Sequence, residues 1–196
     1  MTRYVKTLES LGLSVVFAPQ LVAFADLFTK WNASINLSAA RSCDELDEHI
    51  VDSLHVVTHL TGRSRVLDVG SGGGFPVVIS AICLPDQQFR ALEPVHKKHA
   101  FLRTAARELD LINLESLAIR VDDHDVHDYD AATSRAVFDL REWLEIGVTL
   151  VRPHGLAVGF EAVPRTDLPA TVRRHPYALA GKQRSIVIVE RSLPPT

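Results

Sequence analysis

Residues 66–76, VLDVGSGGGFP, have the composition of a ligand-binding turn between an apolar strand and a helix. Glycines in such a turn accept positive φ angles and let the backbone approach a nucleotide or an amino-acid group at a helix N-terminus. Pro76 suits the first turn of that helix, because the N–H that proline lacks would be unpaired there. Glu93 ends the next apolar run, where a carboxylate can accept hydrogen bonds from a ribose. Together these residues indicate a nucleotide site.

The glycine spacing separates the nucleotides that the turn could bind. Gly70, Gly72 and Gly74 form G-x-G-x-G, whereas a dinucleotide-binding loop has its third glycine at the position occupied here by Phe75. A phosphate-binding loop would need a following Lys-Ser or Lys-Thr pair, and none is present. The strand and loop resemble the first motif of class I S-adenosylmethionine-dependent methyltransferases, whose second strand ends in a ribose-binding acid. NAD(P) binding and a turn that only packs a helix on a strand are the alternatives.

Methyl transfer is an in-line displacement, so the enzyme must chiefly hold donor and nucleophile in line at attack distance. Enzymes that methylate exocyclic amines of bases typically have Asp/Asn-Pro-Pro-aromatic after the fourth strand, where this chain has residues 133–136, TSRA. Cytosine-C5 enzymes need a cysteine nucleophile near the site. Cys83 lies in the helix after the glycine loop, and Cys43 lies in the N-terminal region. Both classes are therefore disfavoured.

The elements that position this turn follow from the spacing of apolar residues. Up to about Arg63, apolar residues recur every three or four positions, which predicts helices and no strand. These positions are Leu21, Phe24, Ala25 and Phe28, followed by Leu46, Ile50, Leu54 and Val57. From Arg65 onward, short β-rich runs alternate with helical ones. We therefore expect an N-terminal helical extension, residues 1–63, and a methyltransferase domain, residues 64–196.

The second part of the chain has the pattern of an α/β fold. The expected strands are 66–69, 89–92, 116–121, 131–137, 156–160 and 185–190, and the expected helices end at Leu84 or span 95–109 and 140–150. This alternation requires crossover connections, which predict a mostly parallel sheet with helices on both faces. The last two strands lie close in sequence and are expected to pair antiparallel. Pro85, Pro94, Pro153 and Gly155 are expected at element ends.

Length and composition limit the class of protein. The chain has 196 residues, 46% of them hydrophobic, and a net charge of -3, which fits one folded domain with an appendage. No apolar run approaches the roughly 20 residues of a membrane span, and the N-terminus carries charges where a signal peptide is apolar. Cys43 and Cys83 lack a metal-binding spacing and are expected to be reduced thiols. We expect a monomeric cytoplasmic protein with no membrane partner.

Charge is distributed unevenly along the chain. Residues 90–107 contain five Lys/Arg and one acid, residues 108–130 contain eight acids and one arginine, and residues 165–191 contain six Lys/Arg and two acids. The two basic stretches offer patches for a nucleic acid, although the whole chain is not basic. The alternative is that these charges form solvated helix faces.

Several stretches resemble one family over most of the chain, from about Leu27 to Val189. They are Trp31-Asn32, Asn36-Leu37-Ser38, residues 49–53 (HIVDS), the glycine loop, Glu93-Pro94, Lys97-Lys98, Phe101-Leu102-Arg103 and Ser134-Arg135-Ala136. In this order they resemble the bacterial 16S ribosomal RNA guanine-N7 methyltransferases, also called the glucose-inhibited division protein B family. The resemblance implies a Rossmann-like, seven-stranded class I fold, S-adenosylmethionine as donor, and 16S ribosomal RNA or the small ribosomal subunit as partner.

The resemblance also implies roles for individual residues. Those implied to bind the donor are Gly70, Gly72, Gly74, Phe75, Glu93, Val121, Asp122 and Arg135. Those implied to bind the substrate are His49, Ser53, Lys97, Lys98, Arg103 and Arg184. Guanine N7 has a lone pair and no proton, so no general base is required. No catalytic residue is therefore certain, and the candidates are His49, Asp52 and Arg135, of which Arg135 could instead clamp an RNA phosphate or the donor carboxylate.

Other polar and aromatic residues have more than one interpretation. His49 and Asp52 lie on one face of a predicted helix and could be a site pair or an exposed pair. Trp31 could stack on a flipped base or be buried in the core. His124 and His127 lie in an acidic loop, but all these side chains crowd one loop without a second ligand cluster. No metal is therefore expected.

The chain departs from the family pattern at three positions. Glu48 stands where the family usually has arginine, Val77 where it has glycine, and Glu161 near a usual Lys-Gly pair. Two of these changes place negative charge where RNA is expected, which weakens phosphate attraction. Two alternatives therefore stay open: a methyltransferase of the same ancestry acting on a small molecule, and a non-catalytic module that binds the donor or the ribosome.

Overall fold

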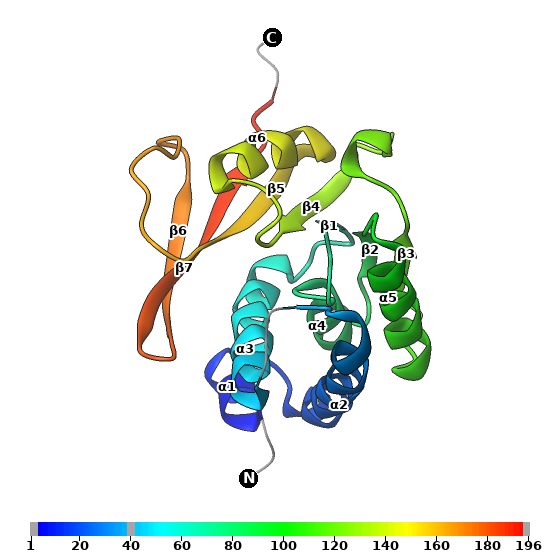
Figure 1. Cartoon of the computed structure of the whole chain (residues 1–196). Helices are drawn as coiled ribbons and strands as arrows, with labels where there is room; N and C mark the ends of the chain where they lie inside the picture. Colours follow the sequence, from blue (N-terminus) through cyan, green and yellow to red (C-terminus); the bar gives the residue numbers. More distant parts are fainter. Residues whose placement is uncertain (1–3, 39–41, 194–196) are drawn as a thin grey trace.

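A seven-stranded sheet forms the centre of the computed structural model, which describes residues 4–38 and 42–193 (Figure 1). Its strands are β1 (Arg65–Val69), β2 (Gln88–Leu92), β3 (Leu114–Leu117), β4 (Tyr129–Ser134), β5 (Val151–Glu161), β6 (Arg173–Leu179) and β7 (Lys182–Glu190). They are ordered β3-β2-β1-β4-β5-β7-β6. The first five strands pair in parallel, and β7 pairs antiparallel with β5 and β6. The predicted mostly parallel sheet and its antiparallel end are confirmed.

Helices cover both faces of the sheet, but unequally. They are α1 (Val5–Ser10), α2 (Ala18–Ile35), α3 (Cys43–Leu60), α4 (Val77–Cys83), α5 (His96–Glu108) and α6 (Leu140–Leu150), with short 3-10 turns η1 (Val15–Phe17) and η2 (Val121–Asp123). Side chains of α1 to α5 share one hydrophobic cluster with the sheet, whereas α6 packs in a second cluster on the other face. Figure 1 shows α6 on the opposite side of the sheet from α1 to α5.

The two long N-terminal helices form as their apolar spacing predicts. Every periodic apolar position singled out in α2 and α3 is buried. The side chain of Ser42 caps the start of α3 by accepting a hydrogen bond from the N–H of Glu45 at 3.1 Å. At the C-terminal end of α2, Asn36 has a φ of 53°, a left-handed conformation that ends the helix and redirects the chain.

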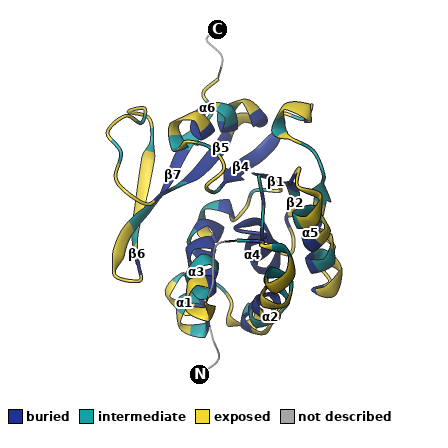
Figure 2. Ribbon diagram, viewed as in Figure 1, coloured by how far each residue is buried: buried dark blue, intermediate teal, exposed yellow. Residues whose placement is uncertain are grey.

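Within the expected extension, the described residues 4–38 and 42–63 pack directly on the sheet domain. Leu21, Phe24 and Ile50 belong to the same buried cluster as Val66 of β1 and Ile186 of β7. Figure 2 shows buried residues on the inner sides of the helices and along the central strands, and an exposed β6 at the sheet edge. None of the helices among the described residues is both long and apolar enough to cross a membrane.

The structure corrects several predicted element boundaries. The fourth strand ends at Ser134 and not at position 137, so Arg135 lies in the connection that follows it. The third strand ends at Leu117, and η2 begins at Val121, the predicted last position of that strand. β5 begins at Val151, and Pro153 lies in the irregular stretch of that strand where its register with β4 shifts. Proline is tolerated there because the regular ladder is interrupted.

One strand, β6, has no counterpart among the strands predicted from the residues. Its sequence, RRHPYAL, lacks alternation of apolar and polar residues and contains Pro176. Both features are compatible with an edge strand, where one side of the backbone needs no partner and most side chains are exposed. This strand completes the seven-stranded sheet that the family resemblance implied.

Candidate active site

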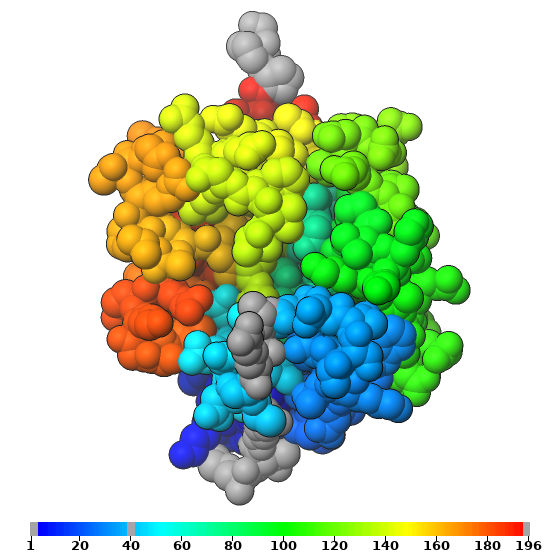
Figure 3. Space-filling model, in the orientation of Figure 1, coloured from blue at the N-terminus to red at the C-terminus, as the bar shows by residue number. Residues whose placement is uncertain are grey.

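A cleft of about 490 Å³ lies at the carboxyl ends of β1 and β4, where open α/β sheets bind ligands. The glycine loop after β1 and the segment after β4 form its centre, and α3, α5 and β7 each add side chains. In the space-filling view, the yellow-green α6 segment faces the cyan α3 segment across the front of the molecule (Figure 3). The sequence-predicted site residues that line this cleft are Gly70, Gly72, Phe75, His49, Asp52, Lys98, Arg135 and Arg184.

The glycine loop uses backbone conformations that favour glycine. Gly70 and Gly72 have φ angles of 71° and 52°. A Cβ on Gly70 would lie 2.2 Å from Cγ2 of Val137, which belongs to the segment after β4. The absence of a side chain at Gly70 therefore allows the two sides of the cleft to approach each other.

Glu93, at the end of β2, holds the glycine loop through its carboxylate. The N–H of Gly72 donates to Oε2 at 2.7 Å, and the N–H of Val95 donates to Oε1 at 2.8 Å. Glu93 is only 4% exposed. Each carboxylate oxygen keeps acceptor capacity beyond its backbone donor, so this group can both fix the loop and accept from a bound hydroxyl.

Asp68 is a buried acid that the sequence prediction did not include among the site residues. It lies in β1, two positions before Gly70, and the Thr133 hydroxyl donates to its Oδ1 at 2.6 Å. Its Oδ2 is buried and has no hydrogen-bond partner among the described residues. Burial raises the pKa of this carboxyl from 3.8 to about 7. A charged residue within the apolar run VLDV was the sequence signal for this position.

Arg135 joins the loop after β4 to α3 and to the glycine loop. Its Cζ lies 4.9 Å from the centroid of the Phe75 ring, and its Nη1 donates to Nδ1 of His49 at 3.2 Å. Because a guanidinium only donates, Nδ1 of His49 accepts and the neutral ring carries its proton on Nε2. Burial, and then the charge of Arg135, lower the pKa of His49 from 6.5 to about 4. The imidazole is therefore neutral at physiological pH.

Asp52 connects three elements beside the cleft. Its Oδ2 lies 3.5 Å from Nη1 of Arg135, and its Oδ1 lies 3.7 Å from Nη1 of Arg184. The Tyr177 hydroxyl, on the edge strand β6, donates to the same Oδ1 at 2.5 Å. Asp52 is 4% exposed, so its charge is compensated by these partners and not by water. Tyr177 was not predicted as a site residue because its strand, β6, was not predicted from the sequence.

Other predicted site residues do not line the cleft. Lys97 is exposed on α5, and Arg103 lies along a separate groove with Arg107 and Leu111. Ser53 is fully buried and donates to the carbonyl of His49 within α3 at 2.8 Å. Gly74 lies in the loop but outside the cleft lining, and Val121 and Asp122 lie on η2, outside it as well. Their assignment to donor or substrate stays a prediction.

The structure also shows the surroundings of Trp31 and His124, for which the sequence left more than one interpretation open. Trp31 is partly buried and packs against the edge of the core, with its ring centroid 5.8 Å from that of Phe101. A ring nitrogen of His124 lies 2.9 Å from the Tyr129 hydroxyl, so this histidine faces the inside of its loop. Within residues 4–38 and 42–193, no group of three or more His, Cys, Asp or Glu side chains is arranged to hold a metal ion.

Glu161 differs from the sequence expectation that its charge faces RNA. It is 3% exposed, and Nε of Arg174 donates to its Oε2 at 3.0 Å. The N–H of Arg165 donates to Oε1 at 3.0 Å. Glu161 lies in β5 and Arg174 in β6, and the two strands flank β7. The ion pair with Arg174 therefore neutralises the buried charge of Glu161 across the sheet. The charge of Glu161 is therefore no argument for a changed substrate. The positions of Glu48 and Val77 do not favour a changed substrate either.

Comparison with known proteins identifies the ancestry of this cleft. The model of the GidB family, rRNA small subunit methyltransferase G, matches residues 18–191. The ribosomal RNA small subunit methyltransferase G of Azoarcus sp. (strain BH72) is 36% identical over 197 residues, covering 94% of this chain and 93% of that protein. The chain belongs to this family. The protein of the same name from Burkholderia lata is 42% identical over 156 residues, covering 76% of this chain and 68% of its own.

Solved structures similar to this GidB family member are methyltransferases. A methyltransferase from Geobacter sulfurreducens superposes with a TM-score of 0.60 and 14% identity, covering 89% of each chain. Coclaurine N-methyltransferase bound to N-methylheliamine and SAH superposes with a TM-score of 0.52 and 16% identity, covering 71% of this chain and 40% of that one. At these identities the likeness establishes the class I methyltransferase fold alone.

In this GidB family member, Asp68→Asn is expected to gain stability relative to the unsubstituted protein as pH rises. Between about pH 4 and 7 the folded protein keeps a proton on Asp68, whose pKa is about 7, whereas the unfolded chain has lost it. This carboxyl therefore lowers the free energy of unfolding as pH rises through that window, and asparagine does not titrate. Urea unfolding of both proteins at about pH 5 and about pH 7.5 measures the difference. Equal differences at the two pH values would contradict the prediction.

Proposed function

We propose that this protein transfers the methyl group of S-adenosylmethionine to N7 of a guanine in 16S ribosomal RNA. One observation carries the proposal. The cleft joins a glycine loop anchored by a buried carboxylate to a group of cations, Lys98, Arg135 and Arg184. The glycine backbone offers a surface to the donor and the cations offer one to a polyanionic acceptor in the same cleft, while Glu93 holds the loop without lining the cleft itself. Membership in the rRNA small subunit methyltransferase G family supports the same reading.

The residues present fit the donor. S-adenosylmethionine supplies an electrophilic methyl group on a sulfonium. Glu93 would accept from the ribose hydroxyls while keeping its bonds to the loop, and the glycine backbone would contact the amino-acid portion. The unpartnered Oδ2 of Asp68 offers a buried acceptor beside the same loop, which suits an ammonium group.

On the acceptor side, the described residues that line the cleft offer cations and no free base. His49 is neutral, and its Nδ1 already accepts from Arg135. Asp52 is compensated by Arg135, Arg184 and Tyr177. A nucleophile that must lose a proton would need an unengaged base, whereas guanine N7 has an available lone pair. The geometry thus favours an acceptor nitrogen without a proton, held in place by charge and stacking.

The direct test is transfer of labelled methyl from S-adenosylmethionine to small ribosomal subunits that lack the family's modification. Deproteinised 16S RNA and large subunits serve as comparison substrates. Incorporation confined to small-subunit RNA and mapped to N7 of a guanine is expected. Donor binding by calorimetry without incorporation into any RNA would overturn the acceptor and keep the donor, and a screen of small-molecule acceptors would follow.

Reversing the charge of Lys98 is expected to affect RNA much more than reversing that of Lys97. Lys98 is half-buried and lines the cleft, whereas Lys97, the next residue on α5, is exposed and outside it. Lys98→Glu should raise KM for the RNA about tenfold and reduce the salt dependence of binding, with Kd for the donor unchanged. Lys97→Glu is the matched control, with an expected change below about threefold. Equal effects would place the RNA on the exposed face of α5.

A further inference from the structure

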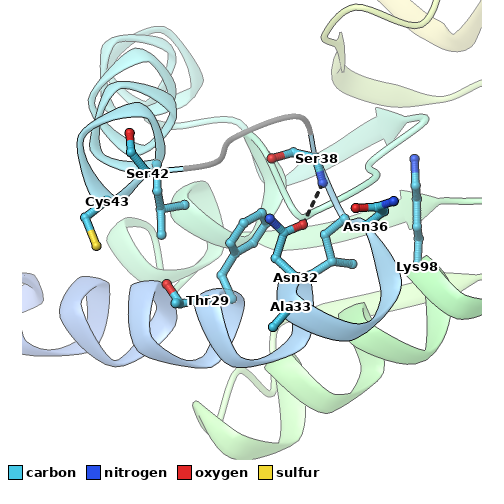
Figure 4. A pocket seen from close by; sticks show the side chains of 11 residues that line it. Thr29, Asn32, Ala33, Asn36, Ser38, Ser42, Cys43 and Lys98 are labelled. Carbon is cyan, nitrogen blue, oxygen red and sulfur yellow. Dashed lines mark hydrogen bonds between the residues drawn. The ribbon is translucent and has the colours of Figure 1, made fainter.

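A second pocket, of about 740 Å³, adjoins the cleft between the end of α2 and the start of α3. We call it the α2–α3 pocket. It shares Leu37, Ser38 and Lys98 with the cleft, so the two cavities lie next to each other. Figure 4 shows Asn32, Asn36 and Lys98 on one side of this pocket, and Ser42 and Cys43 on the other. Its volume lies within the range of pockets that bind small ligands or parts of larger ones.

The walls of the α2–α3 pocket combine an apolar base with a polar rim. Phe28, Leu37 and Leu46 are buried and give apolar surface. Amide side chains of Asn32 and Asn36 and hydroxyl groups form the rim. The N–H of Ser38 donates to Oδ1 of Asn32 at 3.1 Å, which fixes the chain after α2 against that helix. Amides carry both donors and acceptors, so such a rim can pair with the edges of a nucleobase.

Among its described lining residues, the α2–α3 pocket has one positive charge and no negative charge. Lys98 is its only charged lining residue within the described part of the chain, and no carboxylate lines it. Lys98 also forms no salt bridge with another described residue, so its ammonium is not neutralised by a neighbouring acid. A ligand with a neutral polar ring and one nearby phosphate matches this lining. An acidic peptide would leave the apolar base without a partner.

We propose that the α2–α3 pocket binds a nucleotide of the RNA adjacent to the acceptor guanine, with Lys98 contacting the phosphate between them. The inference rests on the proposed function, and it deepens it by assigning a second RNA subsite. Unstacked bases of RNA loops bind in such pockets through ring contacts and edge hydrogen bonds. Because Lys98 lines both cavities, its side chain can reach a phosphate that links nucleotides bound in the two.

Placing a carboxylate in the pocket tests the proposal. Ala33 is an exposed residue of α2 that lines the pocket, and Ser34 is exposed next to it but does not line it. Ala33→Glu is expected to raise KM for small-subunit RNA about tenfold, with the donor Kd unchanged within about twofold. Ser34→Glu adds the same charge to the same helix end and is expected to change KM less than about twofold.

Cysteine chemistry gives a second test, carried out on the folded protein. Cys43 is exposed on the pocket wall and Cys83 is buried, so a maleimide should modify Cys43 in the native protein. Small ribosomal subunits that lack the family's modification are expected to slow the reaction of Cys43 about tenfold, whereas large subunits are not. Modification with a bulky fluorescein maleimide should reduce RNA methylation about tenfold at low RNA concentration and leave donor binding intact. The reagent should not change the activity of Cys43→Ser.

The outcomes separate this inference from the proposed function. Full methylation by the fluorescein-modified protein, or an unchanged KM for RNA in Ala33→Glu, would overturn the subsite while the proposed function stands. Equal reaction of Cys43 with and without small subunits, at subunit concentrations at which the unmodified protein methylates them, would also overturn it. Small subunits that are neither methylated by the unmodified protein nor protective of Cys43 would overturn both proposals.

Discussion

Replacing Glu93 with alanine is expected to weaken S-adenosylmethionine binding by at least 100-fold. The carboxylate of Glu93 is 4% exposed and accepts from the N–H groups of Gly72 and Val95. A hydrogen bond to a charged group contributes about 1.5 to 3 kcal/mol, and a factor of ten in affinity is about 1.4 kcal/mol. The proposed ribose contact alone is then worth a factor of about 10 to 100, and the glycine loop also loses the two bonds that hold it in place, so the combined loss should exceed a factor of about 100. Titration calorimetry measures the donor Kd.

Two further variants control the Glu93 experiment. Glu93→Gln keeps a carbonyl oxygen that can accept from one of the two N–H groups, so its donor Kd should lie between those of the unsubstituted protein and of Glu93→Ala. Glu115→Ala removes an exposed carboxylate of neighbouring β3 that pairs with Arg90 at 2.6 Å, and should leave donor binding unchanged. A folded Glu93→Ala protein with unaltered donor affinity would contradict the role of this carboxylate.

Replacing Arg135 with alanine is expected to lower the rate of methyl transfer on the order of 100-fold or more. Arg135 connects Asp52, His49 and the ring of Phe75, and its substitution removes a cation from the centre of the cleft. Removing one preorganised electrostatic donor from an active site typically costs a factor of this size. Asp52 also loses a partner in a buried environment, so the free energy of unfolding should fall by about 3 kcal/mol. Single-turnover transfer and urea unfolding measure the two effects.

Conservative and distant substitutions distinguish the contributions of Arg135. Arg135→Lys keeps the charge but loses the planar group that lies on Phe75 and bridges to His49, so the rate should recover only partly. Arg141→Ala removes an exposed arginine that pairs with Glu145 at 3.1 Å, and should leave both rate and stability near their original values. Full transfer by Arg135→Ala would remove Arg135 from the site.

The positions predicted best from sequence are those whose structure depends on local spacing. The apolar residues of α2 and α3 recur at helical spacing and are buried as predicted, and the predicted helix 140–150 has the bounds of α6. The glycine loop and Glu93 meet because β1 and β2 are parallel neighbours, so both strands end at the same edge of the sheet. The motif and the strand pattern together were enough to predict that meeting.

The substrate side of the cleft was predicted less completely. His49, Arg135 and Arg184 were candidates by family resemblance, but Lys97 and Arg103, which share a helix with Lys98, do not face the cleft. A charge run gives the number of cations on a helix. It does not give the rotation of that helix against the sheet, which the packing of Phe101 and Leu102 in the core decides.

By itself, the sequence determined the helical N-terminal part, the α/β alternation, the glycine loop and the family. The first three are encoded in backbone preferences or apolar periodicity within a few residues, and the family rests on the resemblance of several stretches between about Leu27 and Val189. Only the tertiary structure decided that Tyr177 donates to Asp52, 125 positions away, and that Arg174 neutralises Glu161. Both pairs depend on β6, an exposed edge strand without apolar alternation. Its place is set by hydrogen bonds to β7, and no short-range pattern reports such pairing.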